Sequence, residues 1–140
     1  MCFNVAEAIN RGWATGDASD WYSRGIKASM SFYGLNDATA FLAQTSVKYA
    51  GNNAVGLTQI LNQKYVAFFQ NSGYEAYYNW RRTGIPTFLV GPGTSNGTKI
   101  PLRFLYPNTE GTTNGMNVNE ATTRQFGGKD DINLPMWLVK

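Results

Sequence analysis

The sequence contains no histidine and only one cysteine, Cys2, among its 140 residues. A single cysteine cannot form an intrachain disulfide, and the usual zinc sites lose most of their ligands without histidine. We therefore expect no metal site and no cofactor. Because only Met1 precedes Cys2, we expect no export signal or lipid anchor within this chain, and we interpret Cys2 as a small apolar residue at a helix start.

Charged residues are also few, at 15% of the chain, and the formal net charge is +3. Lysine and arginine are scattered, and their only adjacent pair, Arg81-Arg82, falls at a predicted helix end, where it complements the helix dipole. A nucleic-acid site needs a basic stripe, so we expect no nucleic-acid partner. The hydrophobic content of 43% can supply the core of one domain.

Apolar residues at helical spacing predict a central helix with one buried face. This helix is predicted to end at Gly73. These residues are Leu57, Ile60, Leu61, Tyr65, Phe68 and Phe69. A second helix is predicted over residues 74–84, with Glu75 in its first turn and Arg81 and Arg82 in its last. Gly84 and Pro86 end it.

Two further helices are predicted over residues 3–13 and 18–33, with Asp17 as the N-cap of the second. Their short connection predicts an antiparallel hairpin of tetratricopeptide type. A third helix is predicted to start from Asp37 and to include Phe41, Leu42 and Thr45, and residues 51–53, Gly-Asn-Asn, break it before the central helix begins.

Beyond residue 84, prolines and glycines exclude long helices, so we predict a short hairpin of strands 87–90 and 100–106 and one helix over 117–126. The predicted fold is therefore mostly α: a single unit, 1–140, with helix hairpins over residues 1–84 and a loop-rich segment over 85–140.

A glycosidase requires two carboxylates, and the candidates for such a pair are Glu110, Asp130 and Asp131. Carboxylates in loops are more often caps and turn residues, and nothing in their spacing brings two of them together. Asp130, Asp131 and Asn133 have oxygen ligands suited to calcium, although a surface turn is again the more common use. We therefore expect a protein that is not an enzyme, with no catalytic residue and no metal ligand.

Aromatic side chains are the other candidates, because their flat apolar faces stack against sugar rings. Tyr65, Phe68, Phe69 and Tyr78 lie on helix stripes and are predicted to pack in the core. Phe88 and Tyr106 lie in extended segments and are the candidate ligand contacts.

Three blocks of sequence follow one another in order: AEAINRGWATGD with YSRGIKASMSFYG, then QKYVAFFQNSGYEAYYNWRRTGIP, then IPLRFLYPNTEGTTNGMNVNEA with GGKDD. Together they resemble the SusD/RagB family of nutrient-binding outer-membrane lipoproteins of gut Bacteroidetes. The resemblance covers nearly the whole chain but only the C-terminal part of a family member. It implies that this chain is a fragment or truncated form of a cell-surface lipoprotein, with a SusD-like fold.

The function implied by the resemblance is non-catalytic capture of an oligosaccharide or other nutrient for delivery to a SusC-like TonB-dependent transporter. The alternative is a helical-repeat scaffold that binds only protein. The family's glycan site draws largely on chain that has no counterpart here, so no ligand contact is transferred from the family.

The positions that match the family best are interpreted as architectural: arginine and glutamate tie loops to helices, and asparagine and proline set turns. They are Gly73, Glu75, Trp80, Arg81, Arg82, Gly84, Pro86, Pro101, Arg103, Tyr106, Pro107, Glu110, Asn114 and Asn117. The chain departs from the family at Met136-Trp137, where relatives often have two tryptophans.

Phe3, Ala6 and Met30 lie off the apolar stripes of their predicted helices. In repeat proteins a neighbouring hairpin covers such residues. We therefore expect the N-terminal hairpin to self-associate through this face, or to be covered by the C-terminal tail.

Overall fold

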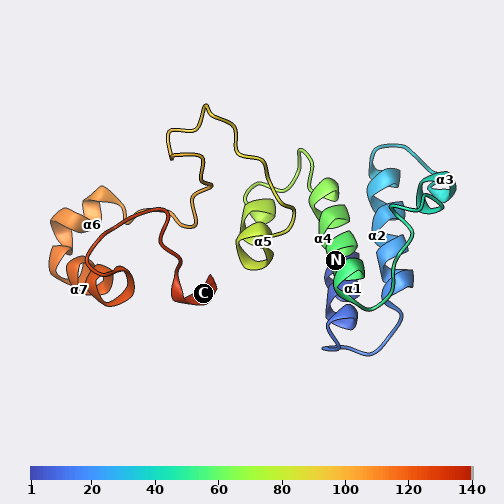
Figure 1. Ribbon diagram of the computed structural model, residues 1–140, viewed down its shortest axis with the longest axis horizontal. Helices are drawn as coiled ribbons and strands as arrows, with labels where there is room; N and C mark the ends of the chain where they lie inside the picture. The colour runs from blue at the N-terminus through green and yellow to red at the C-terminus, as the bar shows by residue number, and fades with distance from the viewer. Residues whose placement is uncertain (140) are drawn as a thin grey trace. The chain divides into compact units, whose positions relative to one another are not determined.

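The computed structural model describes residues 1–139, which contain seven α-helices, a 3-10 turn and no β-strand (Figure 1). The prediction of a mostly α fold is confirmed. The chain divides into two compact units, one covering Met1–Thr87 and the other beginning at Phe88. This division lies close to the change in composition after residue 84, and the expectation of a single unit stays a prediction.

The first unit is built on a hairpin of α1 (Cys2–Asn10) and α2 (Ala18–Phe32), with α4 (Ala54–Ala67) packed against both (Figure 1). Helix α2 begins where predicted because the Asp17 side chain accepts hydrogen bonds from the backbone N–H groups of Ser19 and Asp20.

The core of this unit lies where the three helices meet. It contains Phe3, Ala6, Tyr22, Ile26 and Ile60. A Cβ atom at Gly25 would lie 2.7 Å from the ring of Phe3, so the close approach of α1 and α2 requires glycine there. The Tyr22 hydroxyl donates a hydrogen bond to the Val47 carbonyl at 2.8 Å, which satisfies the polar end of a fully buried ring.

Phe3 and Ala6 are part of the core, so the expectation that they form an exposed face is wrong. Helix α1 contacts both α2 and α4, and two neighbouring helices cover more of its circumference than one apolar stripe indicates. Met30 is half-buried and packs against the same core.

The predicted first helix is too long, because α1 ends at Asn10. Gly12 adopts a left-handed conformation, with φ of 74°, and the chain leaves the helix axis there. Trp13 is therefore exposed, with the Arg11 guanidinium 5.1 Å from its ring centroid. Helix α3 (Thr39–Leu42) is a single turn, shorter than the predicted third helix, which started from Asp37 and included Thr45.

The central helix α4 begins earlier and ends earlier than predicted. Asn53 caps it by accepting hydrogen bonds from the N–H groups of Val55 and Gly56. After Ala67 the chain turns: Gln70 has a positive φ of 62°, and the Phe69 carbonyl accepts a hydrogen bond from the Tyr33 hydroxyl at 2.7 Å. The predicted end at Gly73 is therefore wrong. This contact joins residues far apart in the sequence, which periodicity does not detect.

Helix α5 (Glu75–Thr83) follows the prediction at both ends. Gly84 adopts the left-handed C-cap conformation, with φ of 71°, and the charged residues of the first and last turns lie as expected.

The second unit contains α6 (Asn108–Thr113), α7 (Gly115–Phe126) and the 3-10 turn η1 (Trp137–Val139). The predicted strand hairpin of 87–90 and 100–106 is wrong. The N–H groups of Leu102 and Arg103 instead donate to the Ile132 carbonyl, at 2.7 and 3.2 Å. Helix α6 was missed because its sequence, NTEGTT, has no apolar periodicity, whereas α7 matches the predicted helix and ends at the left-handed Gly127.

Candidate functional site

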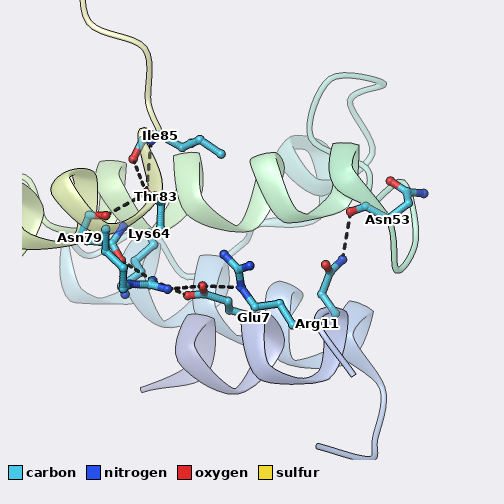
Figure 2. Close-up of polar contacts among 9 residues, drawn as sticks. Glu7, Arg11, Asn53, Lys64, Asn79, Thr83 and Ile85 are labelled. Atoms are coloured by element: carbon cyan, nitrogen blue, oxygen red, sulfur yellow. Dashed lines mark hydrogen bonds and ion pairs between the residues drawn. The ribbon is translucent and has the colours of Figure 1, made fainter. Parts of the chain in front are cut away.

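A cluster of polar side chains joins three helices of the first unit around Glu7 (Figure 2). Glu7 is 4% exposed, and its carboxylate accepts hydrogen bonds from both terminal nitrogens of Arg82, at 2.7 and 2.8 Å. Its Oε1 also accepts from Nε of Arg11 at 2.9 Å. A buried carboxylate is costly unless it is paired, and here two guanidinium groups share it.

Glu7 and Arg82 stabilise each other's charged forms. Burial acts to raise the pKa of Glu7, but the hydrogen bonds and charges of Arg82 and Arg11 outweigh it and hold the pKa below its usual range. The same bond raises the pKa of Arg82. Glu7 is therefore ionised at neutral pH and does not serve as a proton donor.

Asn79 extends the cluster from α5 to α4. Its Oδ1 accepts hydrogen bonds from Arg82 and from the Lys64 ammonium group, both at 2.9 Å (Figure 2). Burial lowers the pKa of Lys64, and the negative charge of Glu7 opposes this shift. These contacts connect Arg11 on α1 with Lys64 on α4.

No sequence pattern predicted Glu7, Asn79 or Lys64 as members of a site. One signal was present: Glu7 is the only charged residue in α1, which is otherwise largely apolar. A single charge in such a helix indicates a buried partner. The sequence did not reveal that this partner is Arg82, 75 residues away.

A second cluster, in the second unit, is centred on Arg103. Its side chain is 3% exposed, and its guanidinium group pairs with Asp130 and lies 4.1 Å from the ring centroid of Phe126. The other carboxylate oxygen of Asp130 accepts a hydrogen bond from the backbone N–H of Tyr106 at 3.0 Å. The cluster therefore fastens the loop before α6 to the end of α7.

The three acidic residues considered for catalysis or calcium binding have local partners. Asp130 is held by Arg103, Asp131 accepts a hydrogen bond from the N–H of Asn133 at 2.8 Å, and Glu110 accepts one from Asn114 at 3.2 Å. These are structural contacts: an ion pair, a turn and a helix contact, as expected for carboxylates in loops.

Several other positions shared with the family lie at helix ends or on α5. Pro107 precedes α6, Asn114 lies between α6 and α7, and Asn117 donates a hydrogen bond to Asn114 Oδ1 at 2.5 Å. On α5, Trp80 stacks on Tyr77 with ring centroids 6.3 Å apart. Their architectural role stays a prediction.

Several aromatic side chains predicted to be core are at the surface. Tyr65, Phe69 and Tyr78 are exposed, and only Phe68 of this group is half-buried. The prediction for these three is wrong: Tyr65 lies on an exposed side of α4, Phe69 lies beyond the end of that helix, and Tyr78 lies on an exposed side of α5. Phe88 and Tyr106 are both half-buried, and their contact with a ligand stays a prediction.

Three hollows on the surface of the first unit differ in volume and in lining. The largest, about 570 Å3, lies between α1, α2, α4 and the start of α5 and is lined by both aromatic and polar side chains. A hollow of about 400 Å3, which includes Ile26, Leu35 and Phe69, is almost wholly apolar. The third, about 350 Å3, includes Tyr65 and Phe69. Only the first offers hydrogen-bonding groups of both charges, Lys64 and Glu75.

Comparison with known proteins identifies relatives of this chain. A family model described as "Starch-binding associating with outer membrane" matches residues 1–107. Two solved SusD homologues from Bacteroides fragilis match 99% of this chain, with TM-scores of 0.88 and 0.87 and sequence identities of 35% and 36%. A solved chitin-binding protein matches over 99% of the chain with a TM-score of 0.80 and 30% identity.

The chain spans about a third of these solved proteins, 34%, 33% and 32% of their lengths respectively. No curated protein matches it. The family model covers most of the sequence, and the helices superimpose on those of relatives at 30% identity or more. This chain therefore belongs to the SusD-like family, whose members are associated with the outer membrane.

Proposed function

We propose that this chain takes part in non-catalytic capture of an oligosaccharide or other nutrient at the bacterial cell surface. The observation that carries the proposal is the match of residues 1–107 to a family described as starch-binding. The chitin-binding relative supports a carbohydrate ligand, since it aligns with nearly the whole chain. The protein containing this chain delivers the ligand to a SusC-like TonB-dependent transporter.

The partners of the acidic residues support binding without catalysis. A glycosidase needs one carboxylate as a proton donor and a second as a base or nucleophile beside the same bond. Asp130 is engaged by Arg103 and by the Tyr106 amide, and Glu110 is engaged by Asn114. Glu7 is buried between two arginines.

The helices within residues 1–139 are all too short or too polar to cross a lipid bilayer. The family description supports a place at the outer membrane. We propose that the protein containing this chain is a cell-surface lipoprotein there.

The alternative function is a protein-interaction scaffold. It is favoured by the apolar hollow of about 400 Å3 and by the exposed side chains of Leu35, Val66 and Phe69 at its edge. Such a surface binds another protein more readily than a sugar, because it has few hydrogen-bonding groups.

A glycan array separates the two functions. The labelled chain should bind starch-derived or chitin-derived oligosaccharides, whereas a protein scaffold should bind no glycan on the array. Incubation with any bound glycan should release no product. Product release by the parent chain and its loss in Glu110→Gln would indicate an enzyme instead.

A further inference from the structure

The hollow of about 570 Å3 in the first unit combines the two kinds of surface that a sugar ring presents. Its volume lies within the usual range of small-molecule sites, about 300–1,000 Å3. Phe32 and Phe68 supply aromatic faces, and Ser29, Lys64, Asn71 and Glu75 supply hydrogen-bonding groups. A pyranose has apolar C–H faces and hydroxyl groups around its edge, so it needs both.

Lys64 is held so that its ammonium group retains donors for a ligand. Its Nζ donates a hydrogen bond to Asn79 Oδ1 at 2.9 Å and lies 5.7 Å from the ring centroid of Phe68. An ammonium group has three N–H donors, so donors remain beyond the bond to Asn79. Asn79 is itself fixed by Arg82, and Arg82 by Glu7, so the position of Lys64 does not depend on a bound ligand (Figure 2).

The charges at the hollow point to a neutral ligand. Lys64 carries one positive charge and Glu75 one negative charge, and both line the hollow. A ligand with a net charge would gain from one of them and be repelled by the other, whereas hydroxyl groups can accept from Lys64 and donate to Glu75. Asn71 both donates and accepts, as hydroxyl groups require.

Phe32 is the aromatic residue best placed to stack. It lies in the last turn of α2 and is 71% exposed, and its ring meets that of Tyr33 edge to face with centroids 5.1 Å apart. An edge contact on one side keeps the ring oriented without covering both of its faces.

We propose that this hollow binds one neutral pyranose unit of an oligosaccharide, with Phe32 stacking on its C–H face and Lys64, Asn71 and Glu75 bonding its hydroxyl groups. The inference rests on the proposed function of glycan capture and assigns it a site within this chain. The apolar hollow around Leu35 lacks the hydrogen-bonding groups for this ligand.

The test compares two exposed phenylalanines by calorimetric titration with maltoheptaose and with chitohexaose. Phe32→Ala removes the proposed stacking ring. Phe69→Ala is the matched control, because Phe69 is 65% exposed and lines the other two hollows but not this one. We expect Phe32→Ala to weaken binding by about tenfold or more and Phe69→Ala to leave it within about twofold. Amide chemical shifts of Ser29 and Asn71 should move during the titration.

Two results would overturn the inference. Equal binding by the parent chain and Phe32→Ala would place the glycan elsewhere and leave glycan capture standing. Failure of the parent chain to bind either oligosaccharide would reject this sugar site, whereas the wider glycan array tests capture itself. Because Phe32 is exposed, its replacement by alanine should preserve the fold, and circular dichroism checks this directly.

Discussion

Glu7 and Arg82 form a doubly hydrogen-bonded ion pair, with distances of 2.7 and 2.8 Å, between the first and fifth helices of the chain. The pair joins α5 to α1 within the first unit. Arg11, at the end of α1, donates a hydrogen bond to the same carboxylate, so Glu7 pairs with two arginines.

Glu7→Gln should destabilise the first unit by about 1–3 kcal/mol, because the amide keeps the shape but leaves two guanidinium groups without their counter-ion. Urea denaturation measures this change. Glu120→Gln is the control: Glu120 pairs with Arg124 on the surface, and its loss should cost less than about 1 kcal/mol. Equal effects of the two substitutions would contradict the importance of the buried pair.

Acid should remove the contribution of Glu7. Burial raises its pKa, but Arg82 and Arg11 together bring the folded-state pKa below the ordinary value of 4.5. The contribution is therefore fully present above that value and is lost as the pH falls through the folded-state pKa. The difference in free energy of unfolding between the parent chain and Glu7→Gln should shrink over that acidic range. A difference that stays constant from neutral pH to well below 4.5 would rule out this linkage.

Gly25→Ala should destabilise the hairpin of α1 and α2 by about 1–3 kcal/mol, since the new methyl group meets the buried Phe3 ring at 2.7 Å. Gly111→Ala is the matched control within a helix, because a Cβ there meets nothing within 4 Å. It should be neutral or slightly stabilising. Thermal unfolding followed by circular dichroism compares the two, and tolerance of Gly25→Ala would show that Phe3 can move aside.

Asp130→Asn should loosen the loop between Arg103 and Pro107, because it leaves the buried Arg103 guanidinium without an anionic partner. The expected cost is about 1–3 kcal/mol, since Asp130 is itself partly exposed. Hydrogen exchange at the Tyr106 amide, which donates to Asp130, should accelerate. Asp131→Asn serves as the control, and exchange at Tyr106 should not change in it.

Self-association of this chain stays a prediction, now through different residues. Phe3 and Ala6 are in the core, whereas Leu35 and Phe69 are exposed beside the apolar hollow. Sedimentation at increasing concentration should give a mass above 15.5 kDa. The double substitution of Leu35→Ser and Phe69→Ser should lower it. A monomer at every concentration would refute the prediction.

The sequence by itself determined most of the helices and several of their limits. Asp17, Gly84 and Gly127 cap their helices because capping depends on side chains and backbone angles within one turn, and such local chemistry is readable from neighbouring residues. The ordered sequence blocks likewise indicated the SusD-like family.

Only the tertiary structure decided which side chains meet. Just beyond the end of α4 the Tyr33 hydroxyl donates a hydrogen bond to the Phe69 carbonyl. Where strands were predicted at residues 87–90 and 100–106, the N–H groups of Leu102 and Arg103 instead donate to the Ile132 carbonyl. The pairing of Glu7 with Arg82, and the hollow that Lys64 lines, arise from helices distant in the sequence. Periodicity reports only one helix at a time, and a buried site requires several helices packed together.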